Sequence, residues 1–272
     1  MKVHIGSAIY RTVEARHHAS LATLIQRPGV EYMPVMGDAL VERSRCISAT
    51  YFLTESDADV HLSIDSDITD FDTDAALGMC QQTFKHDIVG GIYVTRNTTR
   101  TFPTSMFEPG TSVEMSLDPT PFPVRYVATG FMATHRRVFE KLAEDMPLLH
   151  GKDGARAFYP FYIPFIVDDD EGNPILLSED WAFCHRAKDA GFGTYINPAI
   201  RLGHVSQMVF RLEDMFYDPV MPQPCLLERP DNTAKWRIHR STQNDPKNGS
   251  EESRQVRRAQ GRKEAKAGAA SA

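Results

Sequence analysis

The sequence predicts an α/β fold built on a mostly parallel sheet with helices on both faces. Its 272 residues are 42% hydrophobic and 24% charged, the composition of a globular chain long enough for one large domain. Strand-like and helix-like segments alternate four times in the first 95 residues, which is typical of a parallel sheet whose strands are connected by helices. In segment 60–67, an alternating apolar strand runs directly into two aspartates.

Apolar spacing and stop signals place the elements of the first half. Strands are expected at residues 2–9, 31–35 and 88–94 and in the segment leading to Asp65, with helices at 12–26 and 38–52 and from residue 70 onward. Acidic residues open the helix that starts near residue 70, where they complement its dipole. The apolar residues expected to face the core from the first two helices are Val13, Leu21, Leu24, Ile25, Leu40, Val41, Ile47 and Tyr51.

The second half is less regular. Residues 97–123 are polar and contain prolines, as in a functional lid or a disordered segment. A strand or turn is expected at 126–133, a helix at 135–145, and a last strand at 194–200. Between them Ser178 should cap a helix that carries Glu179 and Asp180 in its first turn and stops at Gly191.

Two short segments allow more than one interpretation. The aromatic run 158–165 either fills the core or forms a wall for a planar or sugar ligand. The acidic run 168–172 has the composition of a metal site, but no apolar strand leads into it. We therefore expect a solvated turn there.

The chain is expected to form one domain over residues 1–229, followed by a flexible tail over 230–272. The tail holds ten Lys and Arg against five Asp and Glu, whereas residues 1–229 hold 20 against 31. Its polar composition offers too little apolar surface to support a core. Such a basic tail favours either salt-sensitive contact with a polyanion or a solubilising role.

Several classes of protein are not expected. No run reaches the roughly 18 apolar residues of a membrane span, and the first residues lack a basic segment followed by an apolar core. The cysteines are scattered without metal or redox spacing, and no Gly-x-x-x-x-Gly-Lys loop of a kinase is present. We expect a cytoplasmic protein without a membrane partner, located in the host cytoplasm if the chain is encoded by a virus.

The candidate chemistry begins at Asp65 and Asp67. Ligands of open α/β sheets bind at the carboxyl ends of strands, and both carboxylates directly follow a strand. Two oxygen donors one residue apart can hold Mn²⁺ or Mg²⁺, which in turn neutralises a diphosphate. Asp180 is a candidate general base and His204 a candidate third metal ligand. Each also has a plainer interpretation, as an acidic turn, a partner of a helix dipole or a packed histidine.

Three motifs in this order resemble those of glycosyltransferases with the GT-A fold, most closely the family-two inverting type. They are Asp65-Ser66-Asp67 at a strand end, Thr129-Gly130-Phe131-Met132 before a helix, and Ser178-Glu179-Asp180-Trp181 at the start of another helix. The resemblance covers about residues 1–210. It implies a GT-A, Rossmann-like fold with a mixed, mostly parallel sheet.

The resemblance also implies roles for particular residues. Asp67 would coordinate the metal, Asp65 would assist it or contact the ribose, and His204 would complete the metal shell. Asp180 would be the catalytic base, with Glu179 as its neighbour. The residues that would lie near the donor nucleotide are Ala8, Tyr10, Arg45, Asp65, Ser66 and Gly130. Residues 7–10 lack the proline common in this loop, which leaves recognition of the base open.

The implied function is metal-dependent transfer of a sugar from a nucleoside-diphosphate sugar, with UDP-sugar expected, to an acceptor hydroxyl. The cation would stabilise the leaving diphosphate, and Asp180 would take the acceptor proton in a single inverting displacement. Two alternatives stay open, a sugar nucleotidyltransferase and a non-catalytic module that binds a nucleotide or a sugar. Against the first, residues 7–11 are not a glycine- and lysine-rich phosphate loop.

The acceptor is not readable from the motifs. The basic tail motivates the hypothesis of a nucleic acid acceptor, such as a hydroxymethylated base in viral DNA. A base within a duplex would have to be flipped out of the stack to react. Protein, polysaccharide and small-molecule acceptors remain open.

Overall fold

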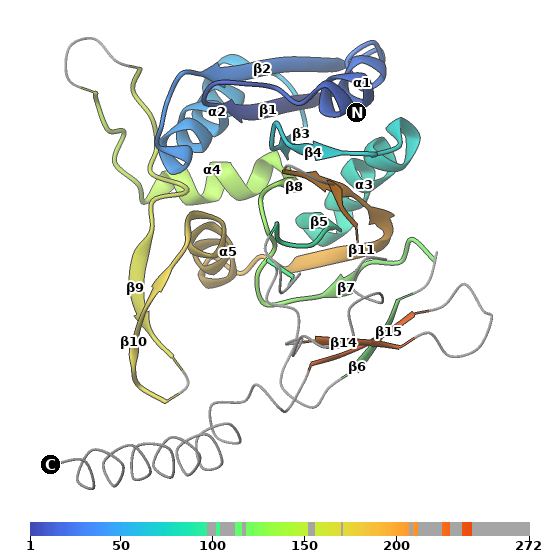
Figure 1. Ribbon diagram of the computed structural model, residues 1–272. Helices are drawn as coiled ribbons and strands as arrows, with labels where there is room; N and C mark the ends of the chain where they lie inside the picture. The colour runs from blue at the N-terminus through green and yellow to red at the C-terminus, as the bar shows by residue number, and fades with distance from the viewer. Residues whose placement is uncertain are drawn as a thin grey trace, which may run out of the picture.

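A seven-stranded sheet in the order β2-β1-β3-β8-β5-β11-β7 forms the centre of the molecule (Figure 1). The computed structural model describes residues 1–96, 102–103, 112–115, 118–151, 156–169, 171–206, 209–211, 225–228 and 236–240. The strands of the sheet are β1 (Val3–Ile9), β2 (Val30–Met36), β3 (Val60–Ile64), β5 (Ile88–Ile92), β7 (Phe122–Pro123), β8 (Phe131–His135) and β11 (Thr194–Arg201). Only β8 and β7 run opposite to the others. The predicted mixed, mostly parallel α/β sheet is confirmed.

Helices cover both faces of this sheet (Figure 1). On one face α1 (Ala15–Leu24) and α3 (Thr73–His86) enclose a buried cluster, and on the other α2 (Val41–Glu55), α4 (Arg136–Glu144) and α5 (Glu179–Asp189) enclose a second. Successive side chains of a strand point to opposite faces, so the central strands supply residues to both clusters. Within the described ranges, no helix is long and apolar enough to cross a membrane.

The inner face of α2 differs from the predicted one. Leu40, just before the helix, and Val41 are 47% and 39% exposed, and Ile47 and Tyr51 line a cavity on the outer side. The buried residues of α2 are mostly small or polar, namely Ser44, Arg45, Cys46, Ser48, Ala49, Thr50 and Phe52. The reason is close packing on β1, because a Cβ atom on Gly6 would collide with the Ser48 side chain. An aliphatic stripe would not fit this gap.

The first helix departs from its predicted pattern in a similar way. Leu21 and Leu24 are buried as expected, but Val13 and Ile25 are exposed by more than a third. His17 is fully buried instead, and its Nδ1 donates to the carbonyl oxygen of Ile68 at 2.8 Å. A histidine with one nitrogen satisfied thus occupies a core position that the apolar pattern did not assign.

The two ambiguous segments have structural roles. Phe161 and Tyr162 of the aromatic run are fully buried, and Tyr162 stacks on Phe183 with ring centroids 4.5 Å apart, so this run fills the core. The described residues of the acidic run lie at the turn of a hairpin, β9 (Phe165–Asp168) and β10 (Pro174–Leu177), which projects from the body (Figure 1). The expected turn is therefore present, although β9, the strand leading into it, was not predicted.

Two three-stranded sheets complete the architecture. One joins β4 (Ile68–Thr69), β12 (Gly203–Val205) and β13 (Val209–Phe210), and the other joins β6 (Ser112–Met115), β14 (Cys225–Glu228) and β15 (Trp236–Arg240). No regular structure was expected beyond residue 229, so β15 is a correction. Its signal is the alternation of Trp236 and Ile238 with basic residues. Most of the 97–123 segment and of the 230–272 tail lies outside the described residues.

A pair of histidines is buried between β1 and α2. His4 and His61 are register partners on adjacent strands, their rings stack at 5.0 Å, and their Nδ1 atoms are 2.9 Å apart. Only one of these two nitrogens can carry the shared proton, so the contact requires at least one neutral ring. Burial lowers the pKa of His4 to about 4 and holds the pKa of His61 well below its ordinary value.

We predict that this pair makes the folded state lose stability on acidification at pH values above those at which carboxylates are protonated. Because the folded-state pKa of His4 lies below its unfolded value near 6.5, the unfolded chain binds the proton more readily. Stability is therefore complete above pH 6.5 and falls as the pH approaches 4, by on the order of 3 kcal/mol for His4 alone. Urea unfolding at pH 7.5 and 5.5 measures this loss.

The double variant His4→Asn with His61→Asn should lose much of this pH dependence, whatever its absolute stability. His18→Asn, on the exposed face of α1, is the matched control. If the stability of the wild type and of the double variant fell equally with decreasing pH, the pH dependence would belong to other groups.

Candidate active site

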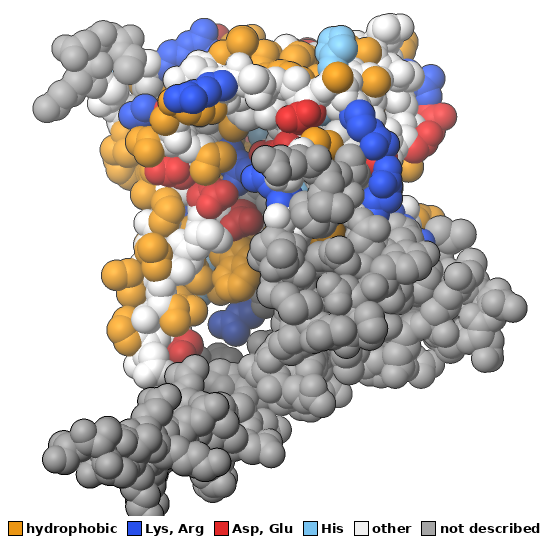
Figure 2. Space-filling view, in the orientation of Figure 1, with side chains coloured by type: hydrophobic (Ala, Val, Ile, Leu, Met, Phe, Trp, Pro, Cys, Tyr) orange, Lys and Arg blue, Asp and Glu red, His pale blue; other side chains and the backbone are white. Residues whose placement is uncertain are grey.

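The candidate side chains gather at the carboxyl ends of β3 and β5. The turn after β3 carries Asp65 and Asp67, and backbone hydrogen bonds hold it to neighbouring segments. The amide of Asp65 donates to the carbonyl oxygen of Gly130 at 3.0 Å, and the carbonyl of Asp67 accepts from Val205 at 2.8 Å. Acidic and basic side chains are interspersed on the face of the molecule drawn in Figure 2. The sheet topology therefore brings separate segments of the chain to one edge.

Arg45 is the central cation of the site. Its Nη2 donates to both carboxylate oxygens of Asp65, each at 2.8 Å, and its Nη1 donates to Oε1 of Glu179. The side chain is only 7% exposed. Burial alone would lower the pKa of Arg45, but Asp65 and Glu179 together raise it above its ordinary value. The guanidinium thus joins α2, the end of β3 and the start of α5.

Glu179 and Asp180 are adjacent in sequence but have different partners. Burial raises the pKa of Glu179, while Arg45 opposes that shift. Asp180 is half-buried, and its Oδ1 accepts from the Ser178 hydroxyl and from the amide of Trp181 at 2.9 Å. Ser178 lies at the predicted N-cap, yet its hydroxyl bonds this carboxylate and makes no capping bond. In the described part of the chain, Asp180 Oδ2 has no hydrogen-bond partner.

Asp67 lies between His204 and Arg96. The sequence analysis selected His204 but not Arg96. The Oδ2 of Asp67 accepts from Nη1 of Arg96, whereas its buried Oδ1 has no hydrogen-bond partner among the described residues. The Nε2 of His204 lies 3.7 Å from that oxygen. Burial alone would raise the pKa of Asp67, but His204 and Arg96 lower it below its ordinary value.

The tautomer of His204 follows from its second contact. The Nδ1 atom lies 2.8 Å from the carbonyl oxygen of Val94, and a carbonyl can only accept, so Nδ1 carries the proton. In the neutral imidazole, Nε2 then presents its lone pair toward Asp67. Histidines that bind metals commonly donate their other ring nitrogen to a carbonyl in this way.

Asp67 and His204 fit a divalent cation, whereas Asp65 does not. An orphaned carboxylate oxygen and a ring nitrogen 3.7 Å apart suit two ligands on one ion with bonds of about 2.0–2.2 Å. Both oxygens of Asp65 are already bonded to Arg45. No group of three or more metal-binding side chains occurs in the described part of the chain. Such a cation would therefore have two protein ligands, with water and substrate phosphates completing its shell.

The residues predicted near the nucleotide lie at the same edge of the sheet. Ala8 lies half-buried near the end of β1. Tyr10 directly follows the strand and is 51% exposed, with the Arg11 guanidinium 4.8 Å from the centroid of its ring. Ser66 is half-buried in the turn after β3, where its carbonyl accepts from Glu14 at 3.2 Å.

Gly130 has a packing role against Tyr93. A Cβ on Gly130 would collide with the Tyr93 hydroxyl and approach Oδ2 of Asp65 to 3.3 Å. The Gly130 amide donates to that hydroxyl at 3.0 Å. Tyr93 and Arg96 are the residues that the sequence analysis missed. Tyr93 directly follows the buried strand β5, and Arg96 lies a few residues further on; this position after a strand end was the available signal.

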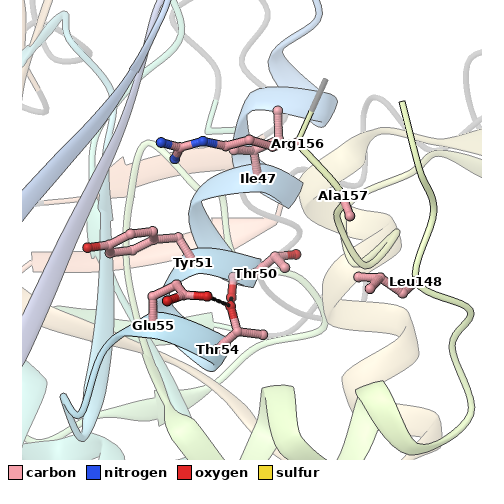
Figure 3. Close-up of a pocket in the computed structure, with 8 residues that line it drawn as sticks. All are labelled: Ile47, Thr50, Tyr51, Thr54, Glu55, Leu148, Arg156 and Ala157. Atoms are coloured by element: carbon pink, nitrogen blue, oxygen red, sulfur yellow. Dashed lines mark hydrogen bonds between the residues drawn. The ribbon is translucent and has the colours of Figure 1, made fainter. Parts of the chain in front are cut away.

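A separate cavity of about 530 Å³ lies on the outer side of α2 (Figure 3). Ile47, Tyr51 and Glu55 line it from the helix, and Leu148 and Arg156 line it from the segment after α4. Ile47 is two positions from Arg45, so the two side chains lie on opposite sides of the helix. This cavity is therefore distinct from the acidic site.

Comparisons with known proteins give similarity to solved structures alone. No protein-family model matches the chain, and no curated protein matches its sequence. The crystal structure of A197 from STIV is 16% identical, covers 76% of this chain and 86% of its own, and has a TM-score of 0.49. The 4-diphosphocytidyl-2C-methyl-D-erythritol synthase from Anaerococcus prevotii DSM 20548 is 11% identical, covers 69% of this chain and 96% of its own, and has a TM-score of 0.32. The assignment of the site therefore depends on this chain's own residues.

We predict that Arg45→Met lowers the stability to unfolding by about 3 kcal/mol, because removing one partner of a buried ion pair leaves the others uncompensated. Chemical denaturation measures the change. Arg45→Lys should lose less, since it keeps the charge and loses the forked geometry.

Arg43→Met is the matched control on the same helix. The side chain of Arg43 is 47% exposed, against 7% for Arg45, so the loss of Arg43 should cost less even though its partner Asp38 is 11% exposed. Equal losses for the Arg43 and Arg45 variants would contradict the central role of Arg45.

Proposed function

We propose that this protein is a metal-dependent glycosyltransferase, which moves a sugar from a nucleoside-diphosphate sugar, UDP-sugar first, to an acceptor hydroxyl with inversion. One observation carries the proposal: the buried, unpartnered Oδ1 of Asp67 faces the Nε2 of His204 at the carboxyl edge of the sheet. A half-buried carboxylate, Asp180, also lies near this edge. Its charge acts on Arg45, which bonds Asp65 directly.

In this proposal Asp67 and His204 hold Mn²⁺ or Mg²⁺, and Asp65 orients Arg45. The ion supplies positive charge that stabilises the leaving diphosphate. The carbonyl of Val94 keeps the His204 ring in the tautomer that offers Nε2. The bidentate bond to Arg45 supports a structural role for Asp65, in place of the metal ligand expected from the sequence.

Asp180 is the proposed general base. The Ser178 hydroxyl and the Trp181 amide hold its Oδ1, which leaves Oδ2 to accept the proton of the acceptor hydroxyl. Glu179 is bonded to Arg45 and has a supporting role. A single displacement with one base inverts the anomeric centre.

The two aspartates should respond differently to neutralisation. Asp67→Asn should weaken UDP binding in the presence of Mn²⁺ by about tenfold or more, because it removes the charge of a metal ligand. Asp65→Asn should keep the dependence on Mn²⁺ and lower the unfolding midpoint instead. Calorimetric titration of UDP with and without Mn²⁺, alongside denaturation, separates the two effects.

Equal loss of Mn²⁺-dependent binding in both variants would restore Asp65 as a metal ligand. Binding of a different nucleoside diphosphate would change the donor and leave the mechanism intact. Preference for a nucleoside triphosphate would favour the nucleotidyltransferase alternative. No binding of any nucleotide or of Mn²⁺ by the wild type would refute the proposed function.

Asp180→Asn should lower the rate of sugar transfer by about 10²- to 10⁴-fold, the usual contribution of a general base. Its affinity for UDP with Mn²⁺ should be unchanged. The assay follows nucleotide release over a panel of acceptors that includes DNA with hydroxymethylated bases, since the basic residues after Pro230 motivate that class. Glu179→Gln is the neighbouring control, and a larger rate loss in that variant would exchange the two roles.

A further inference from the structure

Arg96 has hydrogen-bond donors that no other described residue uses. Its Nη1 donates to Oδ2 of Asp67 and to the carbonyl of Val205 at 3.4 Å. Its Nε and Nη2 have no hydrogen-bond partner among the described residues. The side chain is 47% exposed, in contrast to the buried Arg45. One edge of the guanidinium is therefore anchored, and the other edge is free to bind a ligand.

The anchored edge does not compete with a cation for Asp67. Arg96 contacts Oδ2, whereas Oδ1 is the oxygen that faces His204. One carboxylate can thus bond the guanidinium through one oxygen and a metal ion through the other. Arg96 therefore lies next to the cation position proposed above without occupying it.

The two arginines of the site differ in how accessible their donors are. Asp65, Asp67, Glu179 and Asp180 contribute four carboxylates, whereas Arg45 and Arg96 contribute two guanidinium groups. A divalent ion would offset this difference, and an incoming diphosphate would then need hydrogen-bond donors directed at its oxygens. Arg45 has both Nη groups bonded to carboxylates and is buried, so of these two arginines Arg96 alone has exposed donors.

We propose that Arg96 binds the diphosphate of the donor through Nε and Nη2 while Nη1 remains on Asp67. This inference rests on the proposed function and adds a substrate-binding residue to it. Nε and Nη2 lie on one edge of the planar guanidinium, a geometry that matches two phosphate oxygens. The contact makes Arg96 a determinant of specificity for a diphosphate over a monophosphate.

Two measurements on the full chain test this role. Arg96→Gln should weaken the binding of UDP with Mn²⁺ about 10- to 100-fold, as expected for losing charge-assisted hydrogen bonds. The same variant should reduce the preference of the protein for UDP over UMP. Its affinity for Mn²⁺ alone, measured by the loss of the free-ion resonance signal, should stay within about threefold of the wild type, because Oδ1 and His204 remain.

Arg96→Lys should bind UDP more tightly than Arg96→Gln but less tightly than the wild type, since lysine keeps the charge and lacks the paired donors of the guanidinium. Arg27→Gln is the matched control, because Arg27 is 44% exposed and is also paired with a carboxylate. Arg27 lies near Gly29, whose carbonyl accepts a hydrogen bond from Val3. Val3 is at the amino end of β1, the opposite end of the strand from the candidate site. This control should leave both affinities unchanged.

Three outcomes would overturn the inference. An unchanged UDP affinity in Arg96→Gln would show that Arg96 does not touch the diphosphate. Parallel losses of UDP and Mn²⁺ affinity would reduce Arg96 to a residue that positions Asp67. If the wild type bound neither UDP nor Mn²⁺, the proposed function would fail together with this inference, and that result is distinct from the first two.

Discussion

The candidate site depends on one buried cation, the guanidinium of Arg45. A charge that is 7% exposed is stable only with close partners, and Asp65 and Glu179 supply them. These partners come from the end of β3 and the start of α5, so the ion pairs also fix where those elements meet α2. Asp180 is the next residue along α5, and its position therefore follows from the same network.

Two aspartates separated by one residue have different environments as a result. Both oxygens of Asp65 are bonded to Arg45, which leaves none for a ligand. Asp67 keeps one oxygen buried and unpartnered beside His204. The proposed division of labour, in which one carboxylate supports the site and the other binds the ion, follows from these partners.

The sequence predicted the fold where local signals were strong, as in the alternating strand that leads to Asp65 and in the helix that starts at Glu179 after its predicted N-cap. It was wrong where small or polar residues form the buried surface. Gly6 and Ser48 pack α2 closely on β1, so its aliphatic residues lie outside, and His17 replaces an apolar residue in α1. Close packing of a helix on a strand requires small side chains, and a search for hydrophobic stripes does not detect the size of side chains.

The sequence by itself determined the alternation of strands and helices, the position of Asp65 and Asp67 after a strand, and the start of a helix beside Asp180. These features depend on neighbouring residues, so local patterns reveal them. The tertiary structure alone decided which partner each charge has. Arg45 meets Asp65 across 20 positions and Glu179 across 134, and Arg96 meets Asp67 across 29. Such pairings depend on strand order, including the antiparallel β8 between β3 and β5, and no local pattern encodes that order.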